Sequence, residues 1–202
     1  MTRSAYSIHP TPVGEALLLV TGDGLAALEV LHTPPDVAIE RLSHALGRVP
    51  DDDPSAAADV ADQLDAYFEG ERRVFDLTLD WRLAGDGFVA AALRAVCDIP
   101  YGETASYGEV AVMAGRPRAH RAVGSACAAT PFSLVVPVHR VVRADGSIGE
   151  YGGHPEVKRF LLDLERDHEA ALRARVSRAP GPPSAADAVA DGGPGDGGRD
   201  SA

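Results

Sequence analysis

Three side chains that could act on a bound molecule follow closely on an apolar run in the second half of the sequence. They are His139, Arg140 and Arg143, and the run 134–136 before them ends at Pro137. A buried strand that stops at a proline and is followed by a histidine and two arginines is typical of the wall of a binding or catalytic site. The pattern also fits a strand end with ordinary surface charges, because isolated His-Arg pairs are common.

The charges of this region differ from those of the chain as a whole. The 202 residues carry a formal net charge of -11, which by itself gives no indication of a nucleic-acid partner. Between positions 101 and 143, however, five arginines stand against two acidic residues. A small basic region in an acidic protein is compatible with a surface that faces phosphates, and equally with a solvated charged face. The five arginines are Arg116, Arg118, Arg121, Arg140 and Arg143.

The two cysteines, Cys97 and Cys127, stand among apolar or small residues. Two cysteines in a chain of this length do not form a disulfide framework, so we expect both to be reduced, buried thiols. The histidines have no partner at a spacing typical of metal ligands, and no cofactor is implied. There is no apolar run long enough to span a membrane and no signal-peptide pattern, so we expect a soluble, cytoplasmic protein.

The elements that must position these side chains begin with a small α/β unit over residues 1–84. Apolar runs at 16–20 and 25–30 predict two strands, joined by a glycine-containing hairpin turn at 22–24. The remaining predictions for this unit are a helix at 36–46, a helix at 57–68 that is started by the acidic run 51–53 before Pro54, and a strand at 74–80.

Short helices dominate the next stretch, 85–175. Ser106 and Glu109 are spaced as a capping box, in which each side chain satisfies a free amide at a helix start. The helix that follows ends at Gly115, and a second one extends to about 129, which is typical of a helix-turn-helix. The small side chains of that second helix also fit a tightly packed internal helix. Further helices are predicted at 88–96 and 155–175, and residues 176–202 are predicted to be disordered.

Taken together, these features resemble the O6-alkylguanine-DNA alkyltransferase family. The matching motifs are, in order, Ile-Pro-Tyr-Gly-Glu-Thr from residue 99, Ser-Tyr-Gly-Glu-Val-Ala from 106, Gly-Arg-Pro-Arg-Ala from 115, Arg-Ala-Val-Gly from 121, Pro-Val-His-Arg-Val-Val from 137 and Glu-Tyr-Gly-Gly from 150. The likeness extends more loosely over most of residues 10–168. So many motifs in the same order make the resemblance specific.

The resemblance implies both a fold and an activity. The fold is an α/β N-terminal ribonuclease H-like unit (1–84), followed by a mostly α C-terminal alkyltransferase domain with a helix-turn-helix (85–175). In the family, the second helix enters the minor groove of double-stranded DNA, and an O6-alkylguanine is flipped out of the base stack into a pocket. A cysteine thiolate then takes the alkyl group. The resemblance therefore implies a monomeric DNA-repair protein without a cofactor.

The same resemblance implies roles for individual residues. Tyr107 matches the tyrosine that contacts the flipped base, and Arg121 matches the arginine that fills the vacated stack. His139 and Glu165 match the pair that draws the proton from the acceptor thiol. Four further residues are expected to contact the base or the DNA, namely Thr130, Arg140, Tyr151 and Gly152.

The sequence departs from the family pattern at the position on which alkyl transfer depends. Where the family has Pro-Cys-His-Arg, this chain has Val138 between Pro137 and His139, and a valine has no lone pair with which to attack carbon. Thr130 stands in place of an asparagine and cannot bridge two backbone segments as an amide can. Ala128 and the segment 88–93 also differ from the family pattern. Several departures together favour natural divergence over the replacement of one cysteine.

Three functional hypotheses are compatible with these departures. The first is a non-enzymatic binder of alkylated DNA, like the alkyltransferase-like relatives that lack the cysteine and mark the lesion for nucleotide-excision-repair proteins. The second is an active methylated-DNA–protein-cysteine methyltransferase that uses another thiol. Cys127 is the nearby candidate, although we expect it to lie packed and away from His139. The third is a degenerate paralogue that binds undamaged DNA.

Overall fold

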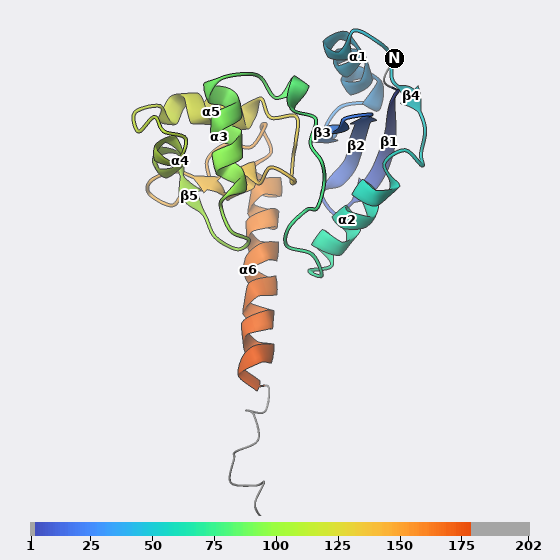
Figure 1. The fold of residues 1–202 in the computed structure, drawn as a ribbon. Helices are drawn as coiled ribbons and strands as arrows, with labels where there is room; N and C mark the ends of the chain where they lie inside the picture. Colours follow the sequence, from blue (N-terminus) through green and yellow to red (C-terminus); the bar gives the residue numbers. More distant parts are fainter. Residues whose placement is uncertain (1–2, 179–202) are drawn as a thin grey trace, which may run out of the picture. The chain divides into compact units, whose positions relative to one another are not determined.

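The computed structural model describes residues 3–178 and contains a small β-sheet followed by a cluster of helices (Figure 1). Residues up to Glu169 belong to one compact unit, and the end of the last helix belongs to a second. The α/β first part and the mostly helical second part that the sequence predicts are both present. The domain limits at residues 84 and 175 stay predictions.

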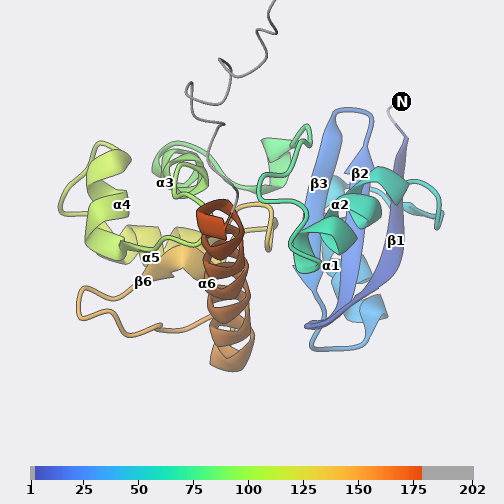
Figure 2. The ribbon, with the colours of Figure 1, turned by 90° about the horizontal axis from the view of Figure 1, so that it is seen from below.

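The first part is built on a four-stranded sheet with the strand order β3-β2-β1-β4. Its first three strands form an antiparallel meander, and the short fourth strand pairs parallel with β1. The two helices α1 and α2 cover opposite faces of the sheet (Figure 2). The bounds are β1 (Ser4–Thr11), β2 (Gly14–Thr21), β3 (Gly24–Val30), α1 (Pro35–Leu46), β4 (Asp51–Asp52) and α2 (Ala58–Phe68).

Four consecutive apolar residues of β2 explain why the sheet needs a helix on each face. Leu17 and Leu19 belong to the core beneath α1, whereas Ala16 and Leu18 belong to the core beneath α2. All four side chains are completely buried. Successive side chains of a strand point to opposite faces, so an uninterrupted apolar run is stable only where both faces are covered.

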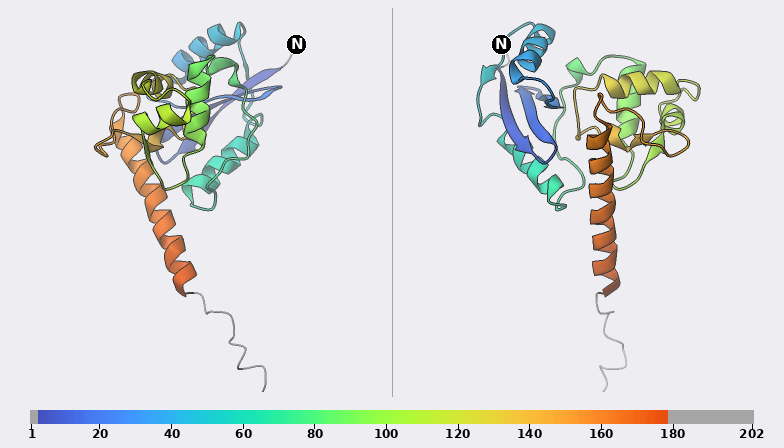
Figure 3. Two further views of the ribbon diagram at one scale, coloured as in Figure 1. Left: turned by 60° about the vertical axis from the view of Figure 1, so that its left-hand side comes forward. Right: turned by 180° about the vertical axis from the view of Figure 1, so that it is seen from behind.

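The second part groups three helices around its own apolar core (Figure 3). The long helix α6 (Pro155–Arg178) contributes Val157 and Leu161 to the core beneath α2 instead, and so connects the two parts. The other elements are a 3-10 turn (Trp81–Leu83), α3 (Phe88–Cys97), α4 (Tyr107–Met113), α5 (His120–Ala128), a 3-10 turn (Val138–Arg140) and the short parallel strands β5 (Ala105–Ser106) and β6 (Val141–Val142).

The predicted capping box begins α4. The Ser106 hydroxyl accepts a hydrogen bond from the backbone amide of Glu109 at 3.2 Å, and the Glu109 carboxylate accepts one from the amide of Ser106 at 2.6 Å. These bonds satisfy two of the amides that a helix start leaves free. They fix the first residue of the helix, Tyr107, at the end of the short strand β5.

Helix α5 packs through one face only. Val123 and Ala126 are buried against the core of the second part, whereas His120, Arg121 and Ser125 are exposed. The helix-turn-helix prediction is therefore confirmed, and the alternative of a tightly packed internal helix is wrong.

The strand predicted at 134–136 is not formed. Leu134 has a positive φ of 69°, and the amide of Val136 donates to the carbonyl of Phe132 at 3.0 Å, so the backbone bonds are local. Leu134 is buried in the core beneath α2, whereas Val136 is buried in the core of the second part. The run is apolar because it passes between two cores, and this produces the same sequence pattern as a buried strand.

The strand predicted at 74–80 is also absent. The side chain of Gln63 takes the place of a neighbouring strand: it accepts from the amide of Asp76 at 2.8 Å and donates to the Asp76 carbonyl at 3.1 Å. Only Leu79 forms an isolated bridge, with Leu25 of β3. A side-chain amide presents the same donor and acceptor as a peptide group, so an alternating sequence is held extended without a ladder.

The acidic run at 51–53 does not start a helix as predicted. Asp51 and Asp52 form the short strand β4, which pairs with β1; neither strand was predicted from the sequence. Asp53 accepts from the amide of Ser55 at 3.0 Å in the turn before α2.

No helix within the described residues is long and apolar enough to cross a membrane. Of the tail predicted to be disordered, residues 176–178 complete α6, and 179–202 lie outside the described residues.

The turn between β2 and β3 offers a test of this packing. Gly24 has a φ of +128°, and a Cβ built there would lie 2.2 Å from the carbonyl oxygen of Thr78. We expect Gly24→Ala to lower the free energy of unfolding by about 2 kcal/mol or more, because a strained φ is combined with a backbone clash. Urea denaturation measures this loss.

Gly47→Ala is the matched control. Gly47 has a φ of +68° at the end of α1, and nothing lies within 4 Å of the added Cβ. The control should lose only about 1 kcal/mol, the usual cost of left-handed backbone in a residue with a side chain. Equal losses in the two variants would show that the close approach to Thr78 contributes nothing.

Candidate functional site

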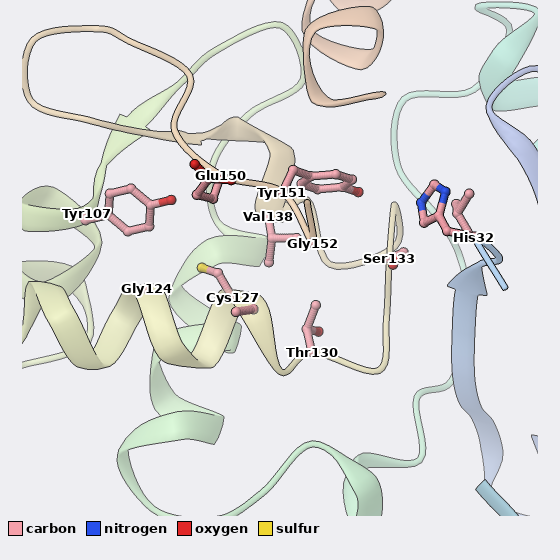
Figure 4. Close-up of a pocket in the computed structure, with 12 residues that line it drawn as sticks. His32, Tyr107, Gly124, Cys127, Thr130, Ser133, Val138, Glu150, Tyr151 and Gly152 are labelled. Carbon is pink, nitrogen blue, oxygen red and sulfur yellow. The ribbon is translucent and has the colours of Figure 1, made fainter. Parts of the chain in front are cut away.

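A cavity of about 180 Å³ brings together five of the residues that the sequence analysis singled out (Figure 4). They are Tyr107, Thr130, Val138, Tyr151 and Gly152. A buried space of about 150 Å³ already holds a benzene molecule, so this cavity has room for a flat ring. The remaining lining residues are Val30, His32, Gly124, Cys127, Ala128, Ser133 and Glu150.

The walls of the cavity come from distant parts of the chain. The capped start of α4 supplies Tyr107, and burial raises the pKa of its phenol, so the hydroxyl stays protonated. Helix α5 supplies Gly124 and Cys127, and the loop before α6 supplies Tyr151. The end of β3 supplies the wall at the opposite end from Tyr107 (Figure 4).

Val138 lies in the middle of the cavity, between Tyr107 and the loop of Tyr151 (Figure 4). It is the first residue of the 3-10 turn after Pro137, and only 5% of it is exposed. Its side chain carries only carbon and hydrogen, so it shapes the cavity but has no nucleophilic atom to offer a bound molecule.

The same 3-10 turn carries His139 and Arg140 into a buried network around Glu165 of α6. Glu165 has no exposed surface and accepts from His139 Nε2 at 2.8 Å. Arg140 binds it in a bidentate manner: Nε donates to Oε2 and Nη2 donates to Oε1, each at 2.9 Å. The hydroxyl of Tyr67 at 2.7 Å and the amide of Gly102 at 3.0 Å complete the set of donors.

The protonation states of this network follow from its contacts. Burial alone would raise the pKa of the Glu165 carboxyl, but the hydrogen bond from His139 and the hydrogen bonds and charge of Arg140 lower it to about 2. Burial lowers the pKa of His139, against the opposing effect of Glu165, so the imidazole is neutral at neutral pH. Because Nε2 donates to Glu165, Nδ1 holds the lone pair, and it is buried without a hydrogen-bond partner among the described residues.

Arg140 lies in this network and does not line the cavity. Its Nη1 donates to the carbonyl of Ile99 at 2.7 Å, and its guanidinium lies over the ring of Tyr101, 5.5 Å from the centroid. Arg121 lies apart from both groups, because it is exposed on the outer face of α5. The predicted site residues therefore form a cavity wall, a buried support behind it, and one exposed arginine.

The two cysteines differ from the expectation that both are buried. Cys97 is exposed, and Cys127 is partly buried. Cys127 packs against the core of the second part, and its sulfur is directed into the cavity (Figure 4). No hydrogen bond joins it to His139 among the described residues, and burial raises the pKa of its thiol to about 11.

Sequence reasoning missed several residues of the site. Val30 and His32 line the cavity because β3 packs against the second part, and no local sequence pattern marks them as site residues. Lys158 does not line the cavity, but its Nζ lies 6.0 Å from the centroid of the Tyr107 ring. It is 1% exposed, donates to the carbonyl of Val141 at 2.5 Å, and has its pKa lowered by burial to about 8. A signal for Lys158 was present, because it stands three residues before the buried Leu161 on one face of α6.

Comparisons with known proteins match both parts of the chain to one family. The family model for the ribonuclease-like domain of 6-O-methylguanine DNA methyltransferase matches residues 5–81. The model for the DNA binding domain of the same family matches residues 87–167.

Individual relatives agree with these matches. The methylated-DNA–protein-cysteine methyltransferase of Methanosarcina barkeri is 37% identical over 166 residues, which cover 81% of this chain and 98% of that protein. The protein of the same name from Mycobacterium bovis is 47% identical over 119 residues, 59% of this chain and 71% of that protein. The structure of Mycobacterium tuberculosis OGT in complex with DNA is similar with a TM-score of 0.70 and 38% identity, over 81% of this chain and 94% of that one.

The buried network predicts a large stability effect for Glu165→Gln. The substitution keeps the shape of the side chain but leaves Arg140 buried without a counter-charge, which should cost about 3 to 5 kcal/mol at neutral pH. The stability of the unaltered protein should also fall with decreasing pH, because the folded pKa of about 2 lies below the unfolded value of about 4.3. The contribution of Glu165 is complete above pH 4.3 or so and is lost as pH falls towards 2 or so.

Urea denaturation between about pH 7 and pH 3 measures both effects. His139 acts in the same direction, since its lowered pKa makes the unfolded chain bind a proton first. Because it lacks the Glu165 carboxyl, the variant should show a flatter acid dependence below about pH 4 than the unaltered protein. Asp163→Asn is the matched control: this half-exposed residue of α6 pairs with Arg166 at 2.8 Å, and the loss of the pair should cost less than about 1 kcal/mol. An equally small loss for Glu165→Gln would contradict the assigned role.

Proposed function

Because the chain belongs to the 6-O-methylguanine DNA methyltransferase family, we propose that it is a DNA-repair protein that binds O6-alkylguanine in DNA by base flipping and does not transfer the alkyl group. The observation that carries this proposal is the cavity whose central wall is Val138. The sequence motif Pro-Val-His-Arg puts this residue where the family pattern has its acceptor cysteine. The chain acts as a monomer, and the complex marks the lesion for nucleotide-excision-repair proteins.

The surface of the helix-turn-helix supports a DNA partner. Arg116 and Arg118 are exposed in the turn, and Arg121 is exposed on α5. Arginines in such positions neutralise phosphates and are attracted to the electronegative minor groove. The similar Mycobacterium tuberculosis protein has been solved with DNA.

The cavity supports recognition of an extruded base. Flipping costs a few kcal/mol of stacking and pairing, and the cost is lower for a damaged base that pairs poorly. Arg121 would fill the vacated stack, and the Tyr107 ring and hydroxyl at one end of the cavity would receive the base. Gly152 leaves the opposite loop open, since nothing lies within 4 Å of a Cβ added there.

The arrangement around Val138 supports binding without transfer. The family reaction needs a thiolate, and the buried His139 lone pair at Nδ1 is the group that would accept its proton. At position 138 there is no thiol to donate that proton. His139, Arg140 and Glu165 therefore hold the turn in place and have no proton to move.

One observation favours a second candidate function. Cys127 opens into the cavity, so an active methyltransferase that uses this thiol remains a candidate. Against it stand the raised pKa of the thiol and the lack of a hydrogen bond to His139 among the described residues. A protonated thiol is a weak nucleophile.

Binding to two duplexes that differ by one O6-methylguanine tests the proposed recognition. We expect tighter binding to the lesion by about tenfold, measured by fluorescence anisotropy at one stated salt concentration, since the phosphate contribution depends strongly on salt. The preference should disappear in Tyr107→Ala and in Arg121→Ala, which lose the base contact and the inserted side chain.

Arg41→Ala is the control for the loss of an arginine. Arg41 lies on α1 and pairs with Glu29 at the surface of the first part, so its loss should leave the preference unchanged. Equal affinity of the unaltered protein for both duplexes would favour a degenerate paralogue that binds undamaged DNA.

Restoring a thiol tests the proposal that only the nucleophile is missing. Val138→Cys should gain single-turnover alkyl transfer from an oligonucleotide with a labelled O6-methyl group, detected as label on the protein. The new sulfur would form a bond to the methyl carbon, the carbon–oxygen bond would break with its electron pair on guanine, and His139 Nδ1 would take the thiol proton.

The unaltered protein and Val138→Ala should both remain unlabelled, the second because it enlarges the cavity without adding a nucleophile. Labelling of the unaltered protein that is lost in Cys127→Ser would overturn the proposal and assign the reaction to Cys127. If Val138→Cys still binds the lesion but gains no label, the network of His139, Arg140 and Glu165 no longer activates a thiol at position 138.

A further inference from the structure

The end of the cavity farthest from Tyr107 is polar and is completed by the first part of the chain (Figure 4). Three side chains gather there: His32 just after β3, Ser133 from the segment after α5, and Tyr151 from the loop before α6. Each carries a group that can donate and accept a hydrogen bond. The arrangement is unusual for a cavity end that would receive a purely hydrocarbon group.

His32 is held in place by a stacking contact. Its ring lies on that of His154 with 3.4 Å between the centroids and 14° between the planes. Burial and the neighbouring His154 lower the pKa of His32, so the ring is neutral at neutral pH and offers one donor and one acceptor. His154 in turn contacts Glu156 through Nδ1 at 3.0 Å, which fixes the outer ring of the stack.

The Tyr151 hydroxyl is the second observation at this end. It is buried, and it has no partner of good hydrogen-bond geometry among the described residues, although the Ser133 side chain lies near enough to lower the pKa of the phenol against the effect of burial. It points towards the His32 end of the cavity, and its neighbour is the Ser133 side chain (Figure 4). A buried hydroxyl whose hydrogen bond is incomplete is costly, so its position favours a ligand that supplies a better partner.

The order of residues along the cavity defines what would reach this end. If the flipped base lies against Tyr107, as the proposed function requires, its O6 atom and the alkyl carbon lie near Val138. A substituent longer than a methyl group then extends past Val138 towards Ser133 and His32 (Figure 4).

We propose that His32, Ser133 and Tyr151 form a polar subsite for the O6 substituent, so that the protein selects guanine adducts whose O6 group ends in a hydroxyl over apolar groups of the same length. This inference rests on the proposed function. A site built from hydrogen-bonding groups rejects an isosteric apolar ligand, because its own polar groups are then left unpaired.

Two adducts of equal size provide the test. Duplexes with one O6-(2-hydroxyethyl)guanine or one O6-propylguanine differ only in a terminal hydroxyl or methyl group. We expect the unaltered full-length protein to bind the hydroxyethyl adduct tighter by about tenfold, in fluorescence anisotropy at one salt concentration. The ratio of the two affinities is the readout, so effects on flipping or on phosphate binding cancel.

Three variants should lower this ratio towards one. Tyr151→Phe removes the hydroxyl and keeps the ring, Ser133→Ala removes the second hydroxyl, and His32→Phe keeps an aromatic ring to stack on His154. Tyr6→Phe is the matched control, since Tyr6 lies on β1 outside the cavity and its variant should keep the ratio. Thermal unfolding of each variant confirms that it is folded.

The outcomes separate this inference from the proposed function. Equal affinities for the two adducts, both tighter than for unmodified guanine, would refute the polar subsite and leave lesion binding intact. Binding of neither adduct tighter than unmodified guanine would contradict the proposed function itself. A preference for hydroxyethyl that persists in all three variants would also refute the assignment of these residues.

Discussion

One buried negative charge organises this molecule. The Glu165 carboxylate has no exposed surface, so it is stable only if hydrogen bonds and a counter-charge replace the water it has lost. Its donors come from separate segments: Tyr67 on α2, Gly102 in the loop before β5, and His139 and Arg140 on the 3-10 turn. The hydrogen bonds to this one carboxylate therefore join the sheet part, the helical part and α6.

This constraint also fixes the cavity. The turn that carries His139 and Arg140 carries Val138 as its first residue, so the contacts of Glu165 determine where the central cavity wall lies. A network that supports the fold in this way would be kept whether or not a nucleophile stands at position 138. The network of His139, Arg140 and Glu165 thus has a structural role that does not depend on the residue at position 138.

The sequence predicted the parts of the fold that depend on local patterns. The helices α1 to α6, the glycine that ends α1 and the capping box of Ser106 follow from periodicity and helix-end chemistry, which act over a few residues. The strand predicted at 134–136 failed because burial in two different cores imitates burial in a sheet. The strand predicted at 74–80 failed because the side chain of Gln63 replaced a ladder. The resemblance supplied most of the site, but His32 enters it only through the packing of β3, which no local pattern records.

Binding without transfer, as we propose, would change what the cavity needs to do. A transferase gains nothing in its chemical step from contacts that hold the substrate and the transition state equally, whereas a protein that only binds gains affinity from each of them. Hydrogen bonds to the far end of an O6 substituent are contacts of this kind, because that end does not change as the carbon–oxygen bond breaks. A polar end formed by His32, Ser133 and Tyr151 is thus better suited to a cavity that retains a lesion than to one that reacts with it. The hydrocarbon wall of Val138 and this polar end are then both consistent with the proposed binding of the lesion without transfer.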